Sequence, residues 1–305
     1  MSVHFRRKFL ALLVPLLTGL PSIAFALSDQ HFDLQIITAD QSKSTGLIVE
    51  ALRARFPTAS TASQVSKRRQ AGKLPIYLAV GPEALRYLAT ASNGGPIISI
   101  FTSYKVFHSV LEIAPWRASA VSAVYADPSP AQQFQLISLI YRKPIQVGVI
   151  LGSDNKHIES VLRRSYTARQ AEVTYETLTA GQDINRALSR LEDVQTILAT
   201  PDSAVYNSET IRTILISTYR RNQAVIGFSA AVVKAGALAS TFSSIDDIVA
   251  QVDELLGEYE TTGHLPAPQF PTYFDTLVNE DVARSLNIVI SDQVLHFSRK
   301  PGGKQ

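Results

Sequence analysis

Residues 122–151 read SAVYADPSPAQQFQLISLIYRKPIQVGVIL. Turn chemistry at Asp127–Pro130 separates the apolar run Ser122–Ala126 from the amphipathic stretch Ala131–Tyr141, and the β-branched run Ile145–Leu151 follows. Proline is favoured in the first helical turn, where its missing N–H costs nothing, so we expect a helix to begin here. The segment therefore predicts a strand, a helix and a second strand, which together form the βαβ unit of a parallel sheet.

The same alternation of short apolar runs and helical periods extends to both sides of this unit. We expect further strands at Leu34–Thr38, Ile76–Val80, Pro96–Phe101, Val173–Leu178, Thr196–Thr200, Ala224–Ser229, Ala237–Phe242 and Tyr273–Val278. We expect helices at Thr45–Phe56, Pro82–Ala91, Lys105–Ile113, Lys156–Tyr166, Asp183–Leu191, Asn207–Tyr219, Ile245–Glu260 and Glu280–Leu286. A chain of this length exceeds what one hydrophobic core usually serves. The sequence thus predicts an α/β protein with two doubly wound parallel-sheet lobes joined by a hinge.

The N-terminus has the pattern of an export signal. Arg6, Arg7 and Lys8 precede the apolar run Phe9–Leu20, and a small-x-small site at Ala24–Ala26 follows. A membrane anchor is the alternative, but the run is interrupted and shorter than the roughly 20 residues of a spanning helix. We predict that residues 1–26 are a cleaved signal peptide. Because the chain has no cysteine, we expect a periplasmic protein without a lipid anchor.

The remaining chain is electrically balanced. Residues 1–26 contain three basic and no acidic side chains, which leaves 26 of each sign. Nucleic-acid binding requires a positive footprint that this composition lacks, and the densest basic cluster, Lys67–Arg69, is read as a solvated helix face or loop. We therefore expect a monomer with no nucleic-acid partner.

Sequence motifs for catalysis are missing. The six histidines are scattered, without a His-x-His or His-Glu-x-x-His pattern, and the chain has no Gly-x-Ser-x-Gly, phosphate-loop or Gly-x-Gly-x-x-Gly motif. We expect no catalytic residues, no metal site and no cofactor, and thus a protein that is not an enzyme. A two-lobed extracytoplasmic hydrolase or isomerase stays an alternative, since fold does not fix function.

Several segments match one known pattern, in order over residues 76–290. They are Ala79–Ala84, Gln133–Ile137, Gln146–Ile150, Thr200–Tyr206, Val225–Ser229 and, most strongly, Val232–Ser240. Together they resemble the substrate-binding proteins of ABC transporters, in the family that includes aromatic amino acid binders and has the type I periplasmic-binding-protein fold. The resemblance implies a periplasmic solute-binding component of an ABC-type importer, with a small-molecule ligand and an inner-membrane ABC permease as partners. An extracytoplasmic ligand-sensing module is the alternative that uses the same lobes.

The resemblance also implies that the chain crosses between lobes more than once. Lobe 1 would comprise residues 27–122 and 236–265, and lobe 2 residues 123–235 and 266–305. Lys234 and Gly236 are the most family-like residues, and we expect them at one of these crossings, as hinge residues. We expect the tail Arg299–Gln305, which contains two glycines, to be disordered.

Candidate ligand contacts follow from the position of strand ends. In open α/β sheets ligands bind outside the carboxyl ends of the strands, where helix N-termini point backbone N–H groups outward. An Asp202 carboxylate could accept bonds from an amine or hydroxyl, as the resemblance implies, or could cap a helix. The predicted ligand-binding residues are Asp40, Gly81, Pro82, Thr102, Ser103, Tyr104, Ser153, Asp154, Asp202, Ser203, Phe228 and Ser229.

Two of these places depart from the family pattern. Many relatives carry Gly-Thr where this chain has Gly81-Pro82, and an Asp-Pro near the place where it reads Thr102–Lys105. Both changes remove or reposition polar groups. The expected ligand is therefore either amino acid-like or a more apolar molecule, such as a lipid or sterol.

Overall fold

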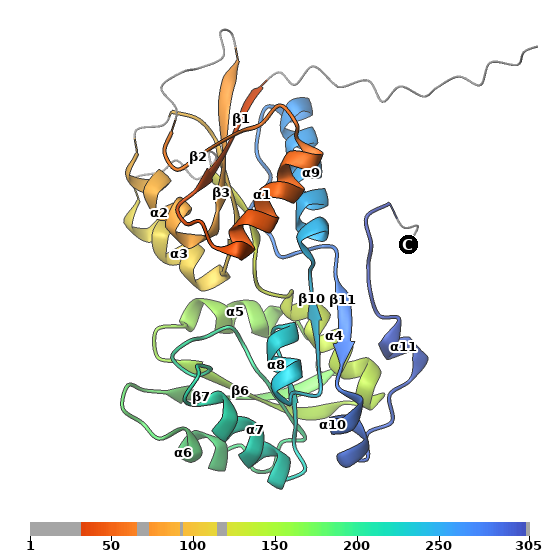
Figure 1. Cartoon of the computed structure of the whole chain (residues 1–305). Helices are drawn as coiled ribbons and strands as arrows, with labels where there is room; N and C mark the ends of the chain where they lie inside the picture. The colour runs from red at the N-terminus through yellow and green to blue at the C-terminus, as the bar shows by residue number, and fades with distance from the viewer. Residues whose placement is uncertain (1–31, 66–72, 92–93, 115–120, 303–305) are drawn as a thin grey trace, which may run out of the picture. The chain divides into compact units, whose positions relative to one another are not determined.

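The computed structural model describes residues 32–65, 73–91, 94–114 and 121–302 (Figure 1). The predicted signal peptide and the basic cluster Lys67–Arg69 lie outside the described residues. Within the described part, no helix is long and apolar enough to cross a membrane.

The first sheet is fully parallel and has the strand order β2-β1-β3-β4-β5. Its strands are β1 (Phe32–Thr38), β2 (Ser60–Ala62), β3 (Leu74–Val80), β4 (Ile97–Thr102) and β5 (Val121–Tyr125). Buried side chains of α1 (Lys43–Arg55) and α9 (Ile245–Thr262) pack on one face, and those of α2 (Gly81–Thr90) and α3 (Tyr104–Ile113) on the other. This layered unit is lobe 1.

The second sheet has the order β11-β10-β9-β8-β6-β7, parallel except for the antiparallel pair β10 and β11. Its strands are β6 (Ile145–Gly152), β7 (Ala171–Leu178), β8 (Thr196–Leu198), β9 (Ala224–Ile226), β10 (Ala239–Phe242) and β11 (Asp275–Val278). One face is covered by α4 (Pro130–Tyr141), α5 (Lys156–Arg164), α10 (Glu280–Ser285) and α11 (Asp292–Leu295). The other is covered by α6 (Ile184–Ser189), α7 (Ile211–Arg220) and α8 (Ala230–Ala235). This unit is lobe 2.

The predicted fold class is confirmed, since both sheets are doubly wound and nearly all parallel. Three short elements escaped the sequence prediction: β2, α8 and α11. Each is at most six residues long, too short to show a period of its own. Side-chain caps explain several helix starts; for example, Ser103 accepts a bond from the Val106 N–H at the start of α3.

The lobe boundaries differ from those predicted. Strand β5 pairs with β4 in the first sheet, and β10 pairs with β9 in the second. The chain therefore leaves lobe 1 after Tyr125, and returns to it only after Phe242. The expectation that Lys234 and Gly236 form a hinge is wrong, because both lie between two strands of the same sheet. Gly236 ends α8 with a φ of 126°, a conformation that favours glycine.

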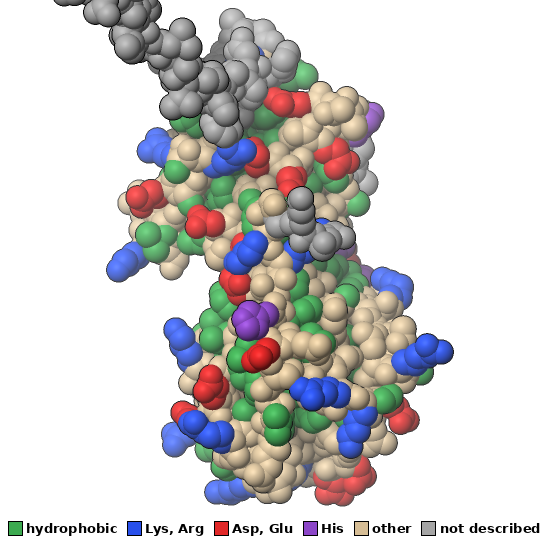
Figure 2. Space-filling model, turned by 90° about the vertical axis from the view of Figure 1, so that its right-hand side faces the viewer, with side chains coloured by type: hydrophobic (Ala, Val, Ile, Leu, Met, Phe, Trp, Pro, Cys, Tyr) green, Lys and Arg blue, Asp and Glu red, His purple; other side chains and the backbone are tan. Residues whose placement is uncertain are grey.

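Charged side chains of both signs are scattered over the face drawn in Figure 2. This distribution fits a chain with nearly equal numbers of acidic and basic residues.

The C-terminal segment is ordered through Gly302, so the predicted disorder of Arg299–Gln305 is wrong for its described part. Backbone bonds of 2.9 Å join Phe274 and Arg299 in both directions. The Thr276 hydroxyl donates to the Phe297 carbonyl at 2.5 Å. This pairing fastens the segment to the strand that enters lobe 2.

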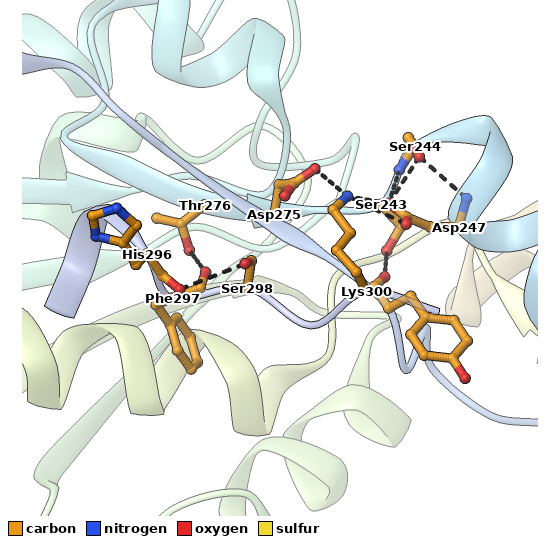
Figure 3. A network of polar contacts seen from close by, with 10 residues as sticks. Ser243, Ser244, Asp247, Asp275, Thr276, His296, Phe297, Ser298 and Lys300 are labelled. Atoms are coloured by element: carbon orange, nitrogen blue, oxygen red, sulfur yellow. Dashed lines mark hydrogen bonds and ion pairs between the residues drawn. The ribbon is translucent and has the colours of Figure 1, made fainter. Parts of the chain in front are cut away.

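Lys300 then bridges the two lobes at the crossing (Figure 3). Its ammonium lies 2.5 Å from the carboxylate of Asp275, the first residue of β11, and 3.3 Å from that of Asp247, in the first turn of α9. Asp247 is buried and also forms a capping box with Ser244. One cation thus joins a helix of lobe 1 to a strand of lobe 2.

Replacing Lys300 with Met should lower the free energy of unfolding by about 1 kcal/mol, because the Lys300 side chain is half exposed and its ion pairs are screened. Urea unfolding measures this loss. Lys143→Met, at an exposed lysine without a partner in the described chain, serves as the control. Equal stability of the two variants would show that the bridge contributes nothing.

Gly148 in β6 tests the packing of the second sheet against β8 and the segment between α6 and β8. A Cβ atom there would lie 2.8 Å from Ile197 Cδ1 and 3.0 Å from Leu191 Cδ1. We expect Gly148→Ala to destabilise the fold by about 1–3 kcal/mol through overpacking. Gly46→Ala, at the fourth residue of α1, where a Cβ atom would meet nothing within 4 Å, should instead stabilise it by about 0.5–1 kcal/mol. Thermal unfolding of both variants decides; a harmless Gly148→Ala would contradict the packing described.

Candidate functional site

Asp202 is the most highly coordinated side chain at the carboxyl ends of the strands. Its carboxylate is fully buried and accepts four hydrogen bonds. The Gly152 N–H and the Asn155 amide donate to Oδ2, both at 2.8 Å. The Ala204 N–H at 3.2 Å and the Lys105 ammonium at 3.3 Å donate to Oδ1. Burial alone would raise the pKa of Asp202, but these donors together lower it.

The bond from Lys105 joins the two lobes. Lys105 lies in the first turn of α3, on lobe 1, whereas Asp202 follows β8 of lobe 2. A second contact between the lobes joins α3 to α5, where the rings of His108 and His157 lie nearly parallel, with centroids 6.5 Å apart. His157 also lies 3.1 Å from Glu112. Helices α3 and α5 therefore carry the contact between the facing edges.

An aromatic cluster adjoins this contact. Tyr104 stacks on Phe270, with centroids 5.6 Å apart and an interplanar angle of 10°. Tyr125 packs edge-on to both rings, and its hydroxyl lies 3.2 Å from His108 Nε2. Burial is the main cause that lowers the pKa of His108, and the nearby His157 lowers it further, against the opposing effect of Glu112. The cluster gives the interlobe region apolar, aromatic walls.

A small cavity of about 20 Å³ lies at the edge of the second sheet. That volume is enough for about one water molecule. Most of the lining is apolar, and the polar groups among it are buried. The Thr200 hydroxyl has no hydrogen-bond partner in the described structure. The lining comprises Asp127, Pro128, Pro130, Gln133, Ile158, Leu162, Leu198, Ala199, Thr200, Pro201, Phe228 and Phe270.

Asp127 is the titratable group of this cavity. It is 5% exposed, and its carboxylate accepts the Tyr104 N–H at 2.7 Å. Burial raises the pKa of Asp127 to about 7, although the bond from Tyr104 acts in the opposite direction. A carboxyl group that is partly protonated near neutral pH can donate as well as accept a hydrogen bond.

Several other predicted contacts have roles within the protein. Ser103 and Ser229 cap α3 and α8, and the Thr102 side chain is buried against Ser99, whose hydroxyl it accepts. The exposed Asp40 carboxylate accepts the Ser42 N–H. Its hydrogen bond with the Thr45 side chain is the main cause that lowers its pKa, and the bonds with Ser42 lower it further. The remaining predicted contacts are Gly81, with φ 81°, Pro82 in the first turn of α2, and the exposed Ser153, Asp154 and Ser203.

The structure brings Tyr104, Asp202 and Phe228 to the region around the cavity and the cross-lobe contact. Ligand contact by any of the twelve predicted residues stays a prediction. Sequence reasoning missed Lys105, Asp127, Asn155, Thr200 and Phe270. Asp127 was read only as turn chemistry, although its place directly after a buried strand was a usable signal; Phe270 lies in a proline-rich loop that carries no period.

Among the described residues, no group of three or more histidine, aspartate or glutamate side chains is arranged to hold a metal ion.

Asp127→Asn should change how stability depends on pH. Because the folded pKa lies above the unfolded value, the native wild type binds more protons between about pH 4 and pH 7, so its stability falls as the pH rises through that window. The amide stays neutral and still accepts the Tyr104 N–H. The stability of Asp127→Asn relative to the wild type should therefore be higher at pH 8 than at pH 5. We expect a difference on the order of 2 kcal/mol, since each unit of pKa difference is about 1.4 kcal/mol.

Urea unfolding at both pH values measures this difference, with the exposed Asp154→Asn as the matched control. Parallel pH profiles of Asp127→Asn and the wild type would show that Asp127 ionises normally.

Solved structures with this arrangement cover most of the chain. The ABC domain in complex with L-Trp from Streptococcus pneumoniae aligns with a TM-score of 0.56 at 15% identity, over 86% of this chain and 98% of that one. The ligand-free, open structure of a substrate-binding protein with adhesive properties from Clostridium difficile gives 0.61 at 12% identity, over 86% and 96%. A conserved domain protein from Vibrio cholerae gives 0.56 at 14% identity, over 87% and 97%.

No family model and no curated protein matches the sequence. The likeness to these solved structures concerns the fold, because the identities are low. It agrees with the two doubly wound sheets of this chain. The chain has the two-lobed α/β fold of the type I periplasmic binding proteins.

Proposed function

We propose that this chain is the periplasmic solute-binding component of an ABC-type importer, and that it captures a small molecule between its lobes. The observation that carries the proposal is the cross-lobe contact of Lys105 with Asp202, beside an apolar cavity with buried polar groups. Ligand sites are concave and mostly apolar, with a few polar groups that fix orientation. The facing strand ends supply both kinds of group.

Opening and closing of the lobes would expose and bury this region. The cavity is too small to hold a solute in the state described, so a ligand must enter while the lobes are apart. Closure would bury apolar surface of the ligand against Tyr104, Phe228 and Phe270. An inner-membrane permease would then recognise the closed form, which is the partner we infer for a monomeric, exported chain.

The ligand class follows in part from comparison. The Streptococcus pneumoniae structure is a complex with L-Trp, and an aromatic ligand fits the aromatic walls seen here. The proposal accordingly covers an amino acid-like ligand or a more apolar one. The two alternative functions differ in what they require: a sensing module needs a receptor as partner, and an enzyme needs turnover.

Native mass spectrometry of the protein purified from periplasm tests the proposal. We expect the wild type to retain one small molecule per chain, and Tyr104→Ala/Phe228→Ala to lose it, because both rings contribute apolar contact area. Tyr219→Ala, at an exposed tyrosine on α7, should retain it. Chemical conversion of the retained molecule would favour the enzyme alternative, and complete absence of any small molecule from the wild type would contradict solute binding.

A further inference from the structure

The Asp202 carboxylate has no acceptor site left for a ligand. A carboxylate offers about four lone-pair sites, two on each oxygen. All four are used by protein donors: Gly152 and Asn155 on Oδ2, and Ala204 and Lys105 on Oδ1. The side chain is also fully buried. A ligand amine could bind here only by displacing one of these donors.

Lys105 is the donor with capacity to spare. Its ammonium has three N–H groups, and Asp202 is its one hydrogen-bond partner among the described residues. The Lys105 side chain is 31% exposed, in contrast to the buried carboxylate that it contacts. Ser103 caps the start of α3, and Lys105 is the second residue of that helix. The cap therefore fixes the backbone of Lys105 at the edge of lobe 1. Two N–H groups are therefore available to an acceptor that enters between the lobes.

The surroundings favour an acceptor with an apolar body. Tyr104, the residue before Lys105, stacks on Phe270, which lines the cavity together with Phe228. Arg164, the last residue of α5 on lobe 2, acts electrostatically on Tyr104 and so adds a second positive charge near this site. Asp127, the other buried acid at this site, accepts the Tyr104 N–H, and burial raises its pKa to about 7, which makes it a weaker partner for an amine than a fully ionised carboxylate. Lys105 is thus the cation at this site that has donors to spare.

We propose that Lys105 is the ligand-binding cation of the interlobe site, and that the ligand is a carboxylate with an apolar, aromatic-sized body and no amine. This inference rests on the proposed function. Asp202 then acts as a positioning residue, since it holds the Lys105 ammonium at the rim and neutralises part of its charge. An amino acid would bring its own ammonium close to the Lys105 ammonium and the Arg164 guanidinium, where like charges disfavour it.

Three indole compounds with the same ring separate the ligand classes: indole-3-propionate has only a carboxylate, tryptamine only an amine, and L-tryptophan both. Calorimetric titration of the wild type, freed of retained molecules, should show binding of indole-3-propionate and at least tenfold weaker binding of the other two. Lys105→Met should weaken indole-3-propionate at least tenfold, whereas Lys105→Arg should keep most of the affinity. Asp202→Asn should weaken binding as well, because Lys105 loses its anchor.

The thermal midpoints of all variants show whether they fold. Tighter binding of L-tryptophan or tryptamine would overturn the inference and leave the solute-binding function standing. Unchanged affinity in a folded Lys105→Met would overturn the role of Lys105. Failure of all three compounds to bind at millimolar concentration would contradict the ligand class, and the molecule retained on purification would still report separately on the function.

Discussion

The coordination of Asp202 is the interaction on which the rest of the site depends. One carboxylate holds the loop after β6 through Gly152 and Asn155, fixes its own turn through Ala204, and contacts lobe 1 through Lys105. A buried charge is costly unless it is paired and hydrogen-bonded. The four donors meet that requirement, and three of them belong to lobe 2. Asp202 is therefore anchored within its own lobe and contacts the other lobe through a single, exchangeable bond.

This asymmetry suits a protein whose lobes separate. When Lys105 leaves, the three donors of lobe 2 still satisfy most of the carboxylate, and water can replace the ammonium. Where the chain crosses between the lobes, Lys300 joins α9 to β11 and the C-terminal segment pairs with the strand that enters lobe 2. The chain crossings are thus held by Lys300 and the C-terminal segment. The facing edges are held by the Lys105–Asp202 ion pair and by the contacts of His157 with His108 and Glu112.

Much of the fold was predictable from the sequence because strand and helix periods are local properties. The strand, helix and strand predicted around residues 122–151 correspond to β5, α4 and β6 within one or two residues. The prediction that they form one βαβ unit is wrong, because β5 and β6 belong to different sheets. The path between lobes was not predictable in the same way. Which sheet β10 joins depends on its pairing with β9 and β11. Likewise, Lys300 is held in place by ion pairs with Asp247 and Asp275, which are far away in sequence. The candidate site follows the same division: strand ends marked Tyr104, Asp202 and Phe228, whereas Lys105, Thr200 and Phe270 became visible only through tertiary contacts.

The distance between the lobes tests the central claim most directly. The chain has no cysteine, so Glu50→Cys on α1 and Arg212→Cys on α7 provide two exposed attachment points for spin labels, one on each lobe. Double electron–electron resonance would then compare the distance between the labels in this chain and in the same chain carrying Lys105→Met, both free of ligand. The account predicts a longer and broader distance distribution when Lys105 is replaced, because the ion pair to Asp202 is lost. An identical distribution in the two proteins would contradict it.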